Sequence, residues 1–422
     1  MNVSDSSKTR CSDNYKMIKM KKGKLIWFSC IMLFLIQIAV AQKTSQKPYK
    51  VFPENIPNEG ILFVDHQKTS RSGHGGHAVT ECANGDIIAF YMNTWAEEWR
   101  GHGAGGWSSY RRSTDGGKTW GEPVDFKYSL DTWNKYDDDV YSAMVFGVVK
   151  APDGTLIATC VRFADSNWRK KKAPVYLLSH DNGHTWSDPI ELDKEATVDD
   201  VSLTMNTNFV RNNEVFIVCF GGAQSPGVGP YSIYVSKDNG KTFSRRSLLP
   251  FDHRNYYSAA GVLDNGDIIV YSYPYPTTGR YADPRKDTDE KNIPYVISKD
   301  GGHTWSEVKN THFAKSVRNP QMSAKVGDYY FMHGRSGSFG ENPNNFVLYS
   351  SKDGINWDEG VYLVSREKTP RAGAGDFYSG NTVIGGSSPS SPKRLLIQAD
   401  ISYNGPRVNI YHWWIEVPKS KK

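Results

Sequence analysis

Five side chains in the first half of the sequence could together carry acid–base chemistry on an acidic sugar. In chain order they are His74, His77, His102, Tyr141 and Arg162. Histidine and tyrosine can remove and donate protons, and arginine can neutralise a carboxylate. The set suits β-elimination beside a uronic acid, because arginine makes the C5 proton more acidic while tyrosine or histidine removes it and protonates the leaving oxygen at C4. Such a reaction requires no carboxylate catalyst.

A second group of candidates lies near the ends of strand-like segments in the second half of the sequence. Corresponding positions of a repeated β-fold converge on a common axis, so we expect these residues to bind substrate together with His74 and Arg162. The group consists of Tyr257, Arg318, Arg335 and Tyr378.

These candidates are embedded in two repeats that run in step. The octet STDGGKTW at 113–120 has close relatives at 179–186, 236–243 and 298–305, and a shorter one at 351–357. A turn that opens a β-branched or aromatic strand begins 24 to 33 residues before each octet, at 84, 153, 212, 265 and 327. Asparagine, aspartate and glycine before such a strand indicate a β-hairpin.

The repeats predict an all-β fold built from six units of about four strands each. The sixth unit lacks an octet but has strand patterns at 394–398 and 408–413, and the early strand at 61–64 is expected to complete it and close a ring. No segment shows helical periodicity. A period of about 50–65 residues with this pattern is typical of a β-propeller.

The octet itself has a structural interpretation. Its Asp can accept backbone N–H groups across a tight turn, its Gly supplies a positive φ, and its aromatic residue can pack between blades. On these octets the chain resembles the sialidase superfamily, whose Asp boxes occupy the turn between the third and fourth strands of each blade, away from the active site. The resemblance covers about residues 70–415 and implies a six-bladed β-propeller with Asp-box turns.

The catalytic residues of a sialidase are only partly matched. The resemblance implies an Arg in the first innermost strand, an Asp before the first Asp box and a Tyr nucleophile assisted by a Glu. Residues 75–79 contain no Arg, residues 105–110 contain no Asp, and the Glu position falls near Ser258. Tyr378, in a Tyr-Ser-Gly context, and Arg318 match. An exo-sialidase-type glycoside hydrolase is therefore the alternative function, and a non-catalytic glycan-binding propeller is the third.

The order His, His, Tyr, Arg also resembles that of propeller-fold ulvan lyases. This resemblance implies that His77 and His102 flank the sugar, that Tyr141 acts as base or acid and that Arg162 holds the carboxylate. The leaving group could be a glycosyl oxygen, as in a polysaccharide lyase, or a free hydroxyl, as in an oligosaccharide dehydratase. β-Elimination at a uronic acid of an ulvan-like glycan is thus the first expectation.

The N-terminus predicts the compartment. Lysines precede an apolar run at 25–41 that ends in Ala-Val-Ala, the pattern of a cleaved secretory signal. We expect a leader at 1–41, a single propeller domain at 42–422 and a secreted or periplasmic protein. The alternative interpretation of the run is a membrane anchor.

Composition limits the partners. A formal net charge of +6 over 422 residues is mild and argues against nucleic acid, which leaves an acidic polysaccharide or oligosaccharide as the expected partner. We expect a monomer without a cofactor, and a structural metal ion stays open. Cys82, Cys160 and Cys219 lie in apolar strand patterns and are expected to be buried thiols.

Overall fold

The structure is a computed structural model. It describes residues 47–95, 105–135, 140–165, 171–195, 203–221, 231–251, 255–274, 291–336, 345–366, 376–385, 392–404 and 407–418. The chain divides into Met1–Pro48 and a compact unit, Tyr49–Lys422. The predicted leader at 1–41 and His102 lie outside the described residues. Within the described ranges, no helix combines the length and apolarity that a membrane span requires.

Tyr49–Lys422 contains six antiparallel sheets, the blades of a propeller. From the innermost strand outward, the first blade is β3 (Val79–Glu81), β4 (Ile87–Thr94), β5 (Gly106–Ser113) and β6 (Val124–Asp125), and the second is β7 (Ser142–Lys150), β8 (Leu156–Phe163), β9 (Lys171–Ser179) and β10 (Ile190–Glu191). The third is β11 (Leu203–Arg211), β12 (Glu214–Phe220), β13 (Tyr231–Ser236) and β14 (Ser244–Leu249), and the fourth is β15 (Asn255–Val262), β16 (Ile268–Pro274), β17 (Asn292–Ser298) and β18 (Lys309–His312). The fifth is β19 (Arg318–Met322), β20 (Tyr330–Ser336), β21 (Asn345–Ser351) and β22 (Val361–Ser365). The sixth is β23 (Ser379–Ile384), β24 (Arg394–Asn404) and β25 (Arg407–Glu416), with β1 (Lys50–Phe52) and β2 (Ile61–Val64) added to β25.

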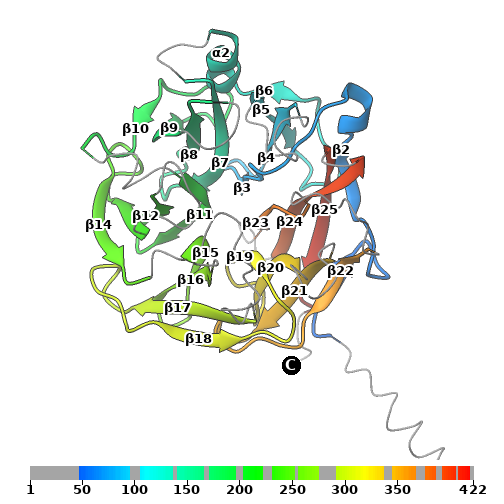
Figure 1. Ribbon diagram of the computed structural model, residues 1–422, viewed down its shortest axis with the longest axis vertical. Coiled ribbons are helices and arrows are strands. Elements are labelled where there is room, and N and C mark those ends of the chain that lie inside the picture. The colour runs from blue at the N-terminus through cyan, green and yellow to red at the C-terminus, as the bar shows by residue number, and fades with distance from the viewer. Residues whose placement is uncertain are drawn as a thin grey trace, which may run out of the picture. The chain divides into compact units, whose positions relative to one another are not determined.

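The blades form a ring in which β3, β7, β11, β15, β19 and β23 are innermost (Figure 1), and neighbouring innermost strands contact each other all the way round. β2 pairs with β25, as the sequence predicts, so the N-terminal strand completes the last blade. This pairing joins the two ends of the propeller domain without a covalent bond.

Hydrophobic side chains fill the space between blades, because the inner strands are buried on both faces. β8, for example, contributes Leu156, Val161 and Phe163 to different apolar clusters. Strands buried in this way are continuously apolar and rich in β-branched residues. The thiols of Cys82, Cys160 and Cys219 are free and buried, as expected.

The Asp boxes lie between the third and fourth strands of five blades. In the box at 179–186, Asp181 accepts hydrogen bonds from the backbone N–H groups of His184 and Thr185. Trp186 of this box packs edge-on against Phe90 and Phe126 of the preceding blade. The repeated turn therefore fastens each blade to its neighbour, and it takes a structural role.

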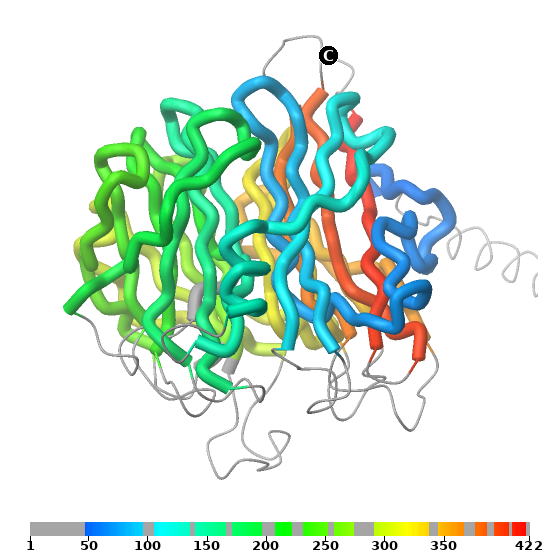
Figure 2. Tube along the Cα trace, turned by 90° about the horizontal axis from the view of Figure 1, so that it is seen from above, coloured from blue at the N-terminus to red at the C-terminus, as the bar shows by residue number. Residues whose placement is uncertain are grey.

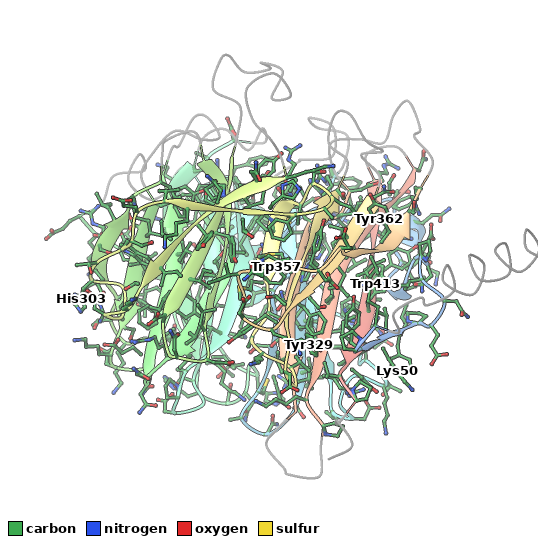
Figure 3. All side chains as sticks on the ribbon, turned by 90° about the horizontal axis from the view of Figure 1, so that it is seen from below. Lys50, His303, Tyr329, Trp357, Tyr362 and Trp413 are labelled. Atoms are coloured by element: carbon green, nitrogen blue, oxygen red, sulfur yellow. The ribbon has the colours of Figure 1, made fainter. Side chains whose placement is uncertain are left out.

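The antiparallel strands define two rims of the ring (Figure 2). At one rim the innermost strands begin, and we call it the site rim. At the other, which we call the box rim, the first hairpin of each blade and the Asp boxes lie. His303, in the fourth box, lies at the periphery of the ring (Figure 3). The predicted separation of the boxes from the candidate residues follows from this topology.

The sequence analysis missed two short helices. A 3-10 helix, η1 (His66–Thr69), precedes the first blade, and α2 (Lys127–Lys135) connects the first blade to the second. α2 spans nine residues and buries only Ser129 fully, so its apolar periodicity is too short to stand out from the surrounding strands.

Candidate active site

Two tyrosines meet at the site rim. Tyr257 near the start of β15 and Tyr378 just before β23 come from separate blades, yet their hydroxyl oxygens lie 2.6 Å apart. Both side chains are buried in the cluster of apolar residues that fills the ring between these blades. One phenol of such a pair can donate its proton to the other, so the pair can stabilise a phenolate or pass on a proton.

A histidine–aspartate pair stands beside the two tyrosines. The ring of His74 contacts the ring of Tyr378 edge-on, with centroids 4.4 Å apart. His74 Nδ1 lies 3.0 Å from Asp400 Oδ2, and the other carboxylate oxygen of Asp400 accepts a 3.0 Å hydrogen bond from the backbone N–H of Tyr378. Asp400 thus fixes both the imidazole and the main chain that carries the phenol.

Burial and hydrogen bonding set the protonation states of this pair. Burial raises the pKa of Asp400, but hydrogen bonds and charge interactions with His74 and His77 outweigh it and hold this pKa below its usual range. Burial lowers the pKa of His74, although Asp400 partly opposes the shift. The site therefore holds a carboxylate against a largely neutral imidazole, which can accept a proton.

His77 belongs to the same polar network and connects Asp400 with Gln398. Its Nε2 lies 3.4 Å from Asp400, and its Nδ1 lies 3.2 Å from the amide nitrogen of Gln398. Gln398 in turn contacts His412 at 2.9 Å. This chain of contacts ties β24 and β25 of the last blade to the segment before β3, so His77 contributes to ring closure.

Two arginines supply positive charge next to the tyrosines. Arg318 and Arg335 are cross-strand partners on β19 and β20, and Arg335 is buried with its guanidinium 5.3 Å above the ring of Tyr378. Burial and the charge of Arg318 lower the pKa of Arg335. Adjacent guanidinium groups repel each other, and an anionic group bound between them would relieve that repulsion.

The same region contains a carboxyl group that is protonated more readily than usual. Asp376 is buried two residues before Tyr378, and its backbone oxygen accepts a 2.6 Å hydrogen bond from Arg335 Nε. Burial, together with the charge of Asp400, raises the pKa of Asp376 to about 7. Two buried carboxyl groups are thus kept in different protonation states.

Backbone geometry marks this rim as unusual. Tyr257, Asn319 and Phe377 have φ angles of 54°, 53° and 66°. Bulky residues rarely adopt this left-handed region, and such conformations cluster at functional sites. The three lie at or beside Tyr257, Arg318 and Tyr378, so the strained backbone positions the candidate side chains.

The structure brings together only part of the set predicted from the sequence. His74, Tyr257, Arg318, Arg335 and Tyr378 gather at the site rim as expected. Arg162 does not join them, because its Nε donates to the backbone oxygen of Ala173 and its Nη2 lies 3.3 Å from Glu191 on the outermost strand of its blade.

Tyr141 takes an intermediate position. It packs against the apolar cluster that contains Tyr257 and Tyr378, and its ring meets Trp133 of α2 edge-on at 5.3 Å. It therefore lies at the site rim next to β7, three blades round the ring from the arginines of β19 and β20.

Sequence reasoning missed Asp400, Gln398 and Asp376. Gln398 and Asp400 interrupt the apolar strand pattern that begins with Leu395-Leu396-Ile397, and Asp376 directly precedes Phe377. A polar residue inside a buried strand pattern could have drawn attention to Gln398 and Asp400. Among the described residues, no group of three or more His, Cys, Asp or Glu side chains is arranged to hold a metal ion.

Comparison with solved structures agrees with the fold. A protein of unknown function from Dyadobacter fermentans superposes with a TM-score of 0.62 at 13% identity, covering 85% of this chain and 98% of its own. A Hadza microbial sialidase gives 0.60 at 15% identity over 84% of this chain and 68% of its own, and Trypanosoma rangeli sialidase gives 0.53 at 12% over 86% and 58%. At these identities the likeness concerns the fold alone.

Sequence comparison gives the family. An exo-alpha-sialidase from Aspergillus fumigatus is 31% identical over 119 residues, which are 27% of this chain and 28% of the relative, so the match spans about a quarter of that protein's length. The BNR repeat-like domain matches residues 58–280 and 131–403. The chain therefore belongs to the BNR repeat-like domain family and is a six-bladed β-propeller.

Proposed function

We propose that the protein is a secreted carbohydrate-active enzyme that acts on an acidic glycan at the site rim. The observation that carries the proposal is the meeting of Arg335, Tyr378 and Tyr257, with the His74–Asp400 pair alongside. A cation, a pair of phenols and a histidine suit a substrate whose carboxylate lies next to the bond that breaks. The substrate partner is an acidic polysaccharide or oligosaccharide, the enzyme is a monomer, and the chemistry needs no cofactor.

The first candidate reaction is β-elimination at a uronic acid. Arg335 and Arg318 bind the carboxylate, and the hydroxyl oxygen of Tyr378 takes the proton from C5 while its own proton passes along the hydrogen bond to Tyr257. The C–H electrons form the C4–C5 double bond, the C4–O bond breaks, and the leaving oxygen takes the hydroxyl proton of Tyr257. The sequence predicted that Arg162 would bind the carboxylate of the substrate. This role is now assigned to Arg318 and Arg335, because Arg162 pairs with Glu191.

The second candidate is an exo-sialidase-type glycoside hydrolase, favoured by the Tyr-Ser-Gly context of Tyr378 and by the exo-alpha-sialidase relative. In that reaction the Tyr378 oxygen attacks the anomeric carbon, the glycosidic C–O bond breaks, and the leaving oxygen takes up the proton that Tyr378 loses. Water later hydrolyses the bond between the sugar and Tyr378. The mechanism needs a carboxylate to activate the nucleophile. Tyr257 contacts Tyr378 here, which is why elimination is placed first.

Tyr378→Phe tests the proposal, with Tyr141→Phe as a matched change at the same rim. Substrates are uronate oligosaccharides, followed by ultraviolet absorbance of the unsaturated product, and sialyl oligosaccharides, followed by release of free sialic acid. Tyr378→Phe should reduce turnover by about 10²–10⁴ while binding persists, because the proton carrier is lost and the ring is kept.

The product identifies the reaction. Absorbance with cleavage of the chain indicates a lyase, absorbance without cleavage indicates a dehydratase, and free sialic acid indicates the hydrolase. Full activity of Tyr378→Phe together with loss in Tyr141→Phe would contradict the assignment of Tyr378. Binding without any product would leave a glycan-binding propeller and contradict an enzyme.

A further inference from the structure

A second cationic group lies on the site rim, outside the tyrosine cluster. The guanidinium carbon of Arg71 lies 4.4 Å from the ring centroid of Trp95 and 4.4 Å from that of Trp107. Both indoles therefore make cation–π contacts with the guanidinium. Trp95 is one of the few large apolar side chains on the described surface, with 44% of its area exposed.

The surrounding backbone fixes this group in place. The main-chain N–H of Arg71 donates to His66, its main-chain oxygen accepts a 2.8 Å hydrogen bond from Tyr403, and the next residue, Ser72, exchanges two 2.9 Å backbone bonds with Thr94. Asp125 accepts a 2.7 Å hydrogen bond from the indole of Trp107 and so orients that ring. The group is therefore built before any ligand arrives, which lowers the entropy cost of binding.

The guanidinium of Arg71 can bind an anionic group of a ligand. The N–H donors of its guanidinium lie in a planar fork that matches a carboxylate or sulfate ester. Within the described ranges, no carboxylate lies within salt-bridge distance of Arg71. The hydrogen bond that Arg71 Nη1 donates to the backbone oxygen of Asn93 is long at 3.5 Å.

The position of this group relates it to the tyrosine cluster. Arg71 lies three residues before His74, and a chain of three residues spans at most about 10–11 Å. The segment that carries the histidine beside Tyr378 therefore also carries Arg71, on the same rim. An oligosaccharide that places one sugar at Tyr378 has the length to reach Arg71 with another.

We propose that Arg71, Trp95 and Trp107 form a subsite that binds a further anionic sugar of the substrate, with the guanidinium edge on its carboxylate or sulfate and the exposed indole against its ring. The inference rests on the proposed function and deepens it: the substrate is an oligomer or polymer with more than one anionic sugar. Aromatic faces stack on the apolar face of sugars, so both parts of the ligand have a partner.

Binding to four polymers (ulvan, alginate, polygalacturonate and chondroitin sulfate) tests the subsite by affinity electrophoresis and calorimetry, with Tyr378→Phe as the background so that ligand is not consumed. Arg71→Gln should weaken binding of the polymer that binds best by about 10- to 100-fold, the effect of one charge-assisted hydrogen bond. Trp95→Ala, an exposed change with little risk to folding, should also weaken it.

Arg394→Ala is the matched control. Arg394 also stacks on an indole, Trp414, at 4.4 Å, but near the backbone of Gly116 on the box rim. This variant should bind as the background protein does. Unchanged binding in both Arg71→Gln and Trp95→Ala, or no binding of any polymer to the background protein, would overturn the subsite.

The failure of the subsite and the failure of the proposed function give different results. If turnover depends on Tyr378 while Arg71→Gln and Trp95→Ala bind polymer normally, the function stands and the subsite is wrong. If Arg71→Gln weakens binding while the natural protein forms no product from any substrate, the subsite stands and the proposed enzymatic function is wrong.

Discussion

Asp400 is the residue on which the geometry of the candidate site depends most directly. It connects His74, which touches Tyr378, with the main chain of Tyr378 itself. Asp400→Asn keeps the shape but removes the charge and one acceptor. We expect turnover to fall at least ~10²-fold with little change in KM, because the imidazole loses its orientation while the arginines still hold the substrate.

The same substitution should also destabilise the fold, because it leaves buried partners unsatisfied. Activity is therefore compared per folded molecule, after urea unfolding has been used to measure stability. Asp264→Asn, at the exposed pair with Lys325, serves as the control and should change neither quantity strongly. Normal turnover per folded molecule of Asp400→Asn would show that the pair only closes the ring.

The raised pKa of Asp376 predicts that the free energy of unfolding depends on pH. Its pKa of about 7 in the folded state lies above the ordinary value near 3.8, so the folded state binds the proton more tightly than the unfolded chain does. This contribution is full below pH 4 and is lost as pH rises to 7. Asp376→Asn should therefore raise the free energy of unfolding by roughly 2–4 kcal/mol at pH 8, with a much smaller gain at pH 4. Equal effects at both values, measured by urea unfolding, would contradict the raised pKa.

At the scale of the element, the Asp box holds neighbouring blades of the propeller together. The Gly of each box approaches the preceding blade, and in the first box Gly117 has φ 87° with a Cβ position only 2.3 Å from the indole of Trp414. Gly85 has the same φ of 87° in a hairpin turn, but nothing lies within 4 Å of its Cβ position. The two glycines therefore separate backbone strain from packing.

Alanine at these two positions should differ in cost. Gly85→Ala should lower the free energy of unfolding by about 1–2 kcal/mol, which is the strain of a left-handed residue. Gly117→Ala should cost about 1–3 kcal/mol more, because Trp414 must move. Thermal and urea unfolding of the two variants measure the difference, and equal destabilisation would mean that the box does not fasten the blades through this contact.

At the scale of the whole molecule, the sequence was sufficient to predict the ring of blades but not which side chains meet at the candidate site. Turn residues such as Asn84-Gly85 and the box residues act locally, so their spacing alone predicts six blades and the closing strand β2. The direction of a side chain is harder to predict where a strand is buried on both faces, because no polar alternation marks the axis side. Arg162 and Arg335 both lie near the ends of second strands, yet only Arg335 reaches the tyrosines. Asp400 contacts His74 across 326 positions of sequence, which no local pattern can reveal.

Buried histidines make the last blades of the ring sensitive to acid. His66, His74 and His412 lie where the last blade meets the first, and His333 joins β20 to Ser379 and Asn381 on either side of its ring. Burial lowers the pKa of His333 to about 3, well below its ordinary value of 6.5. The unfolded chain therefore takes up the proton first as pH falls, and the contribution of His333 to stability is full above pH 6.5 and is lost towards pH 3.

His333→Gln measures this loss against a background of other titrating groups. The variant should be less stable than the natural protein at pH 7, and the difference in free energy of unfolding should shrink by about 2–3 kcal/mol between pH 7 and pH 4.5, because the substitution removes the protonation cost. Asp376 titrates with the opposite sign in this range but is present in both proteins, so it cancels in the difference. A constant difference for His333→Gln would mean that this ring is protonated as easily in the folded propeller as in the unfolded chain.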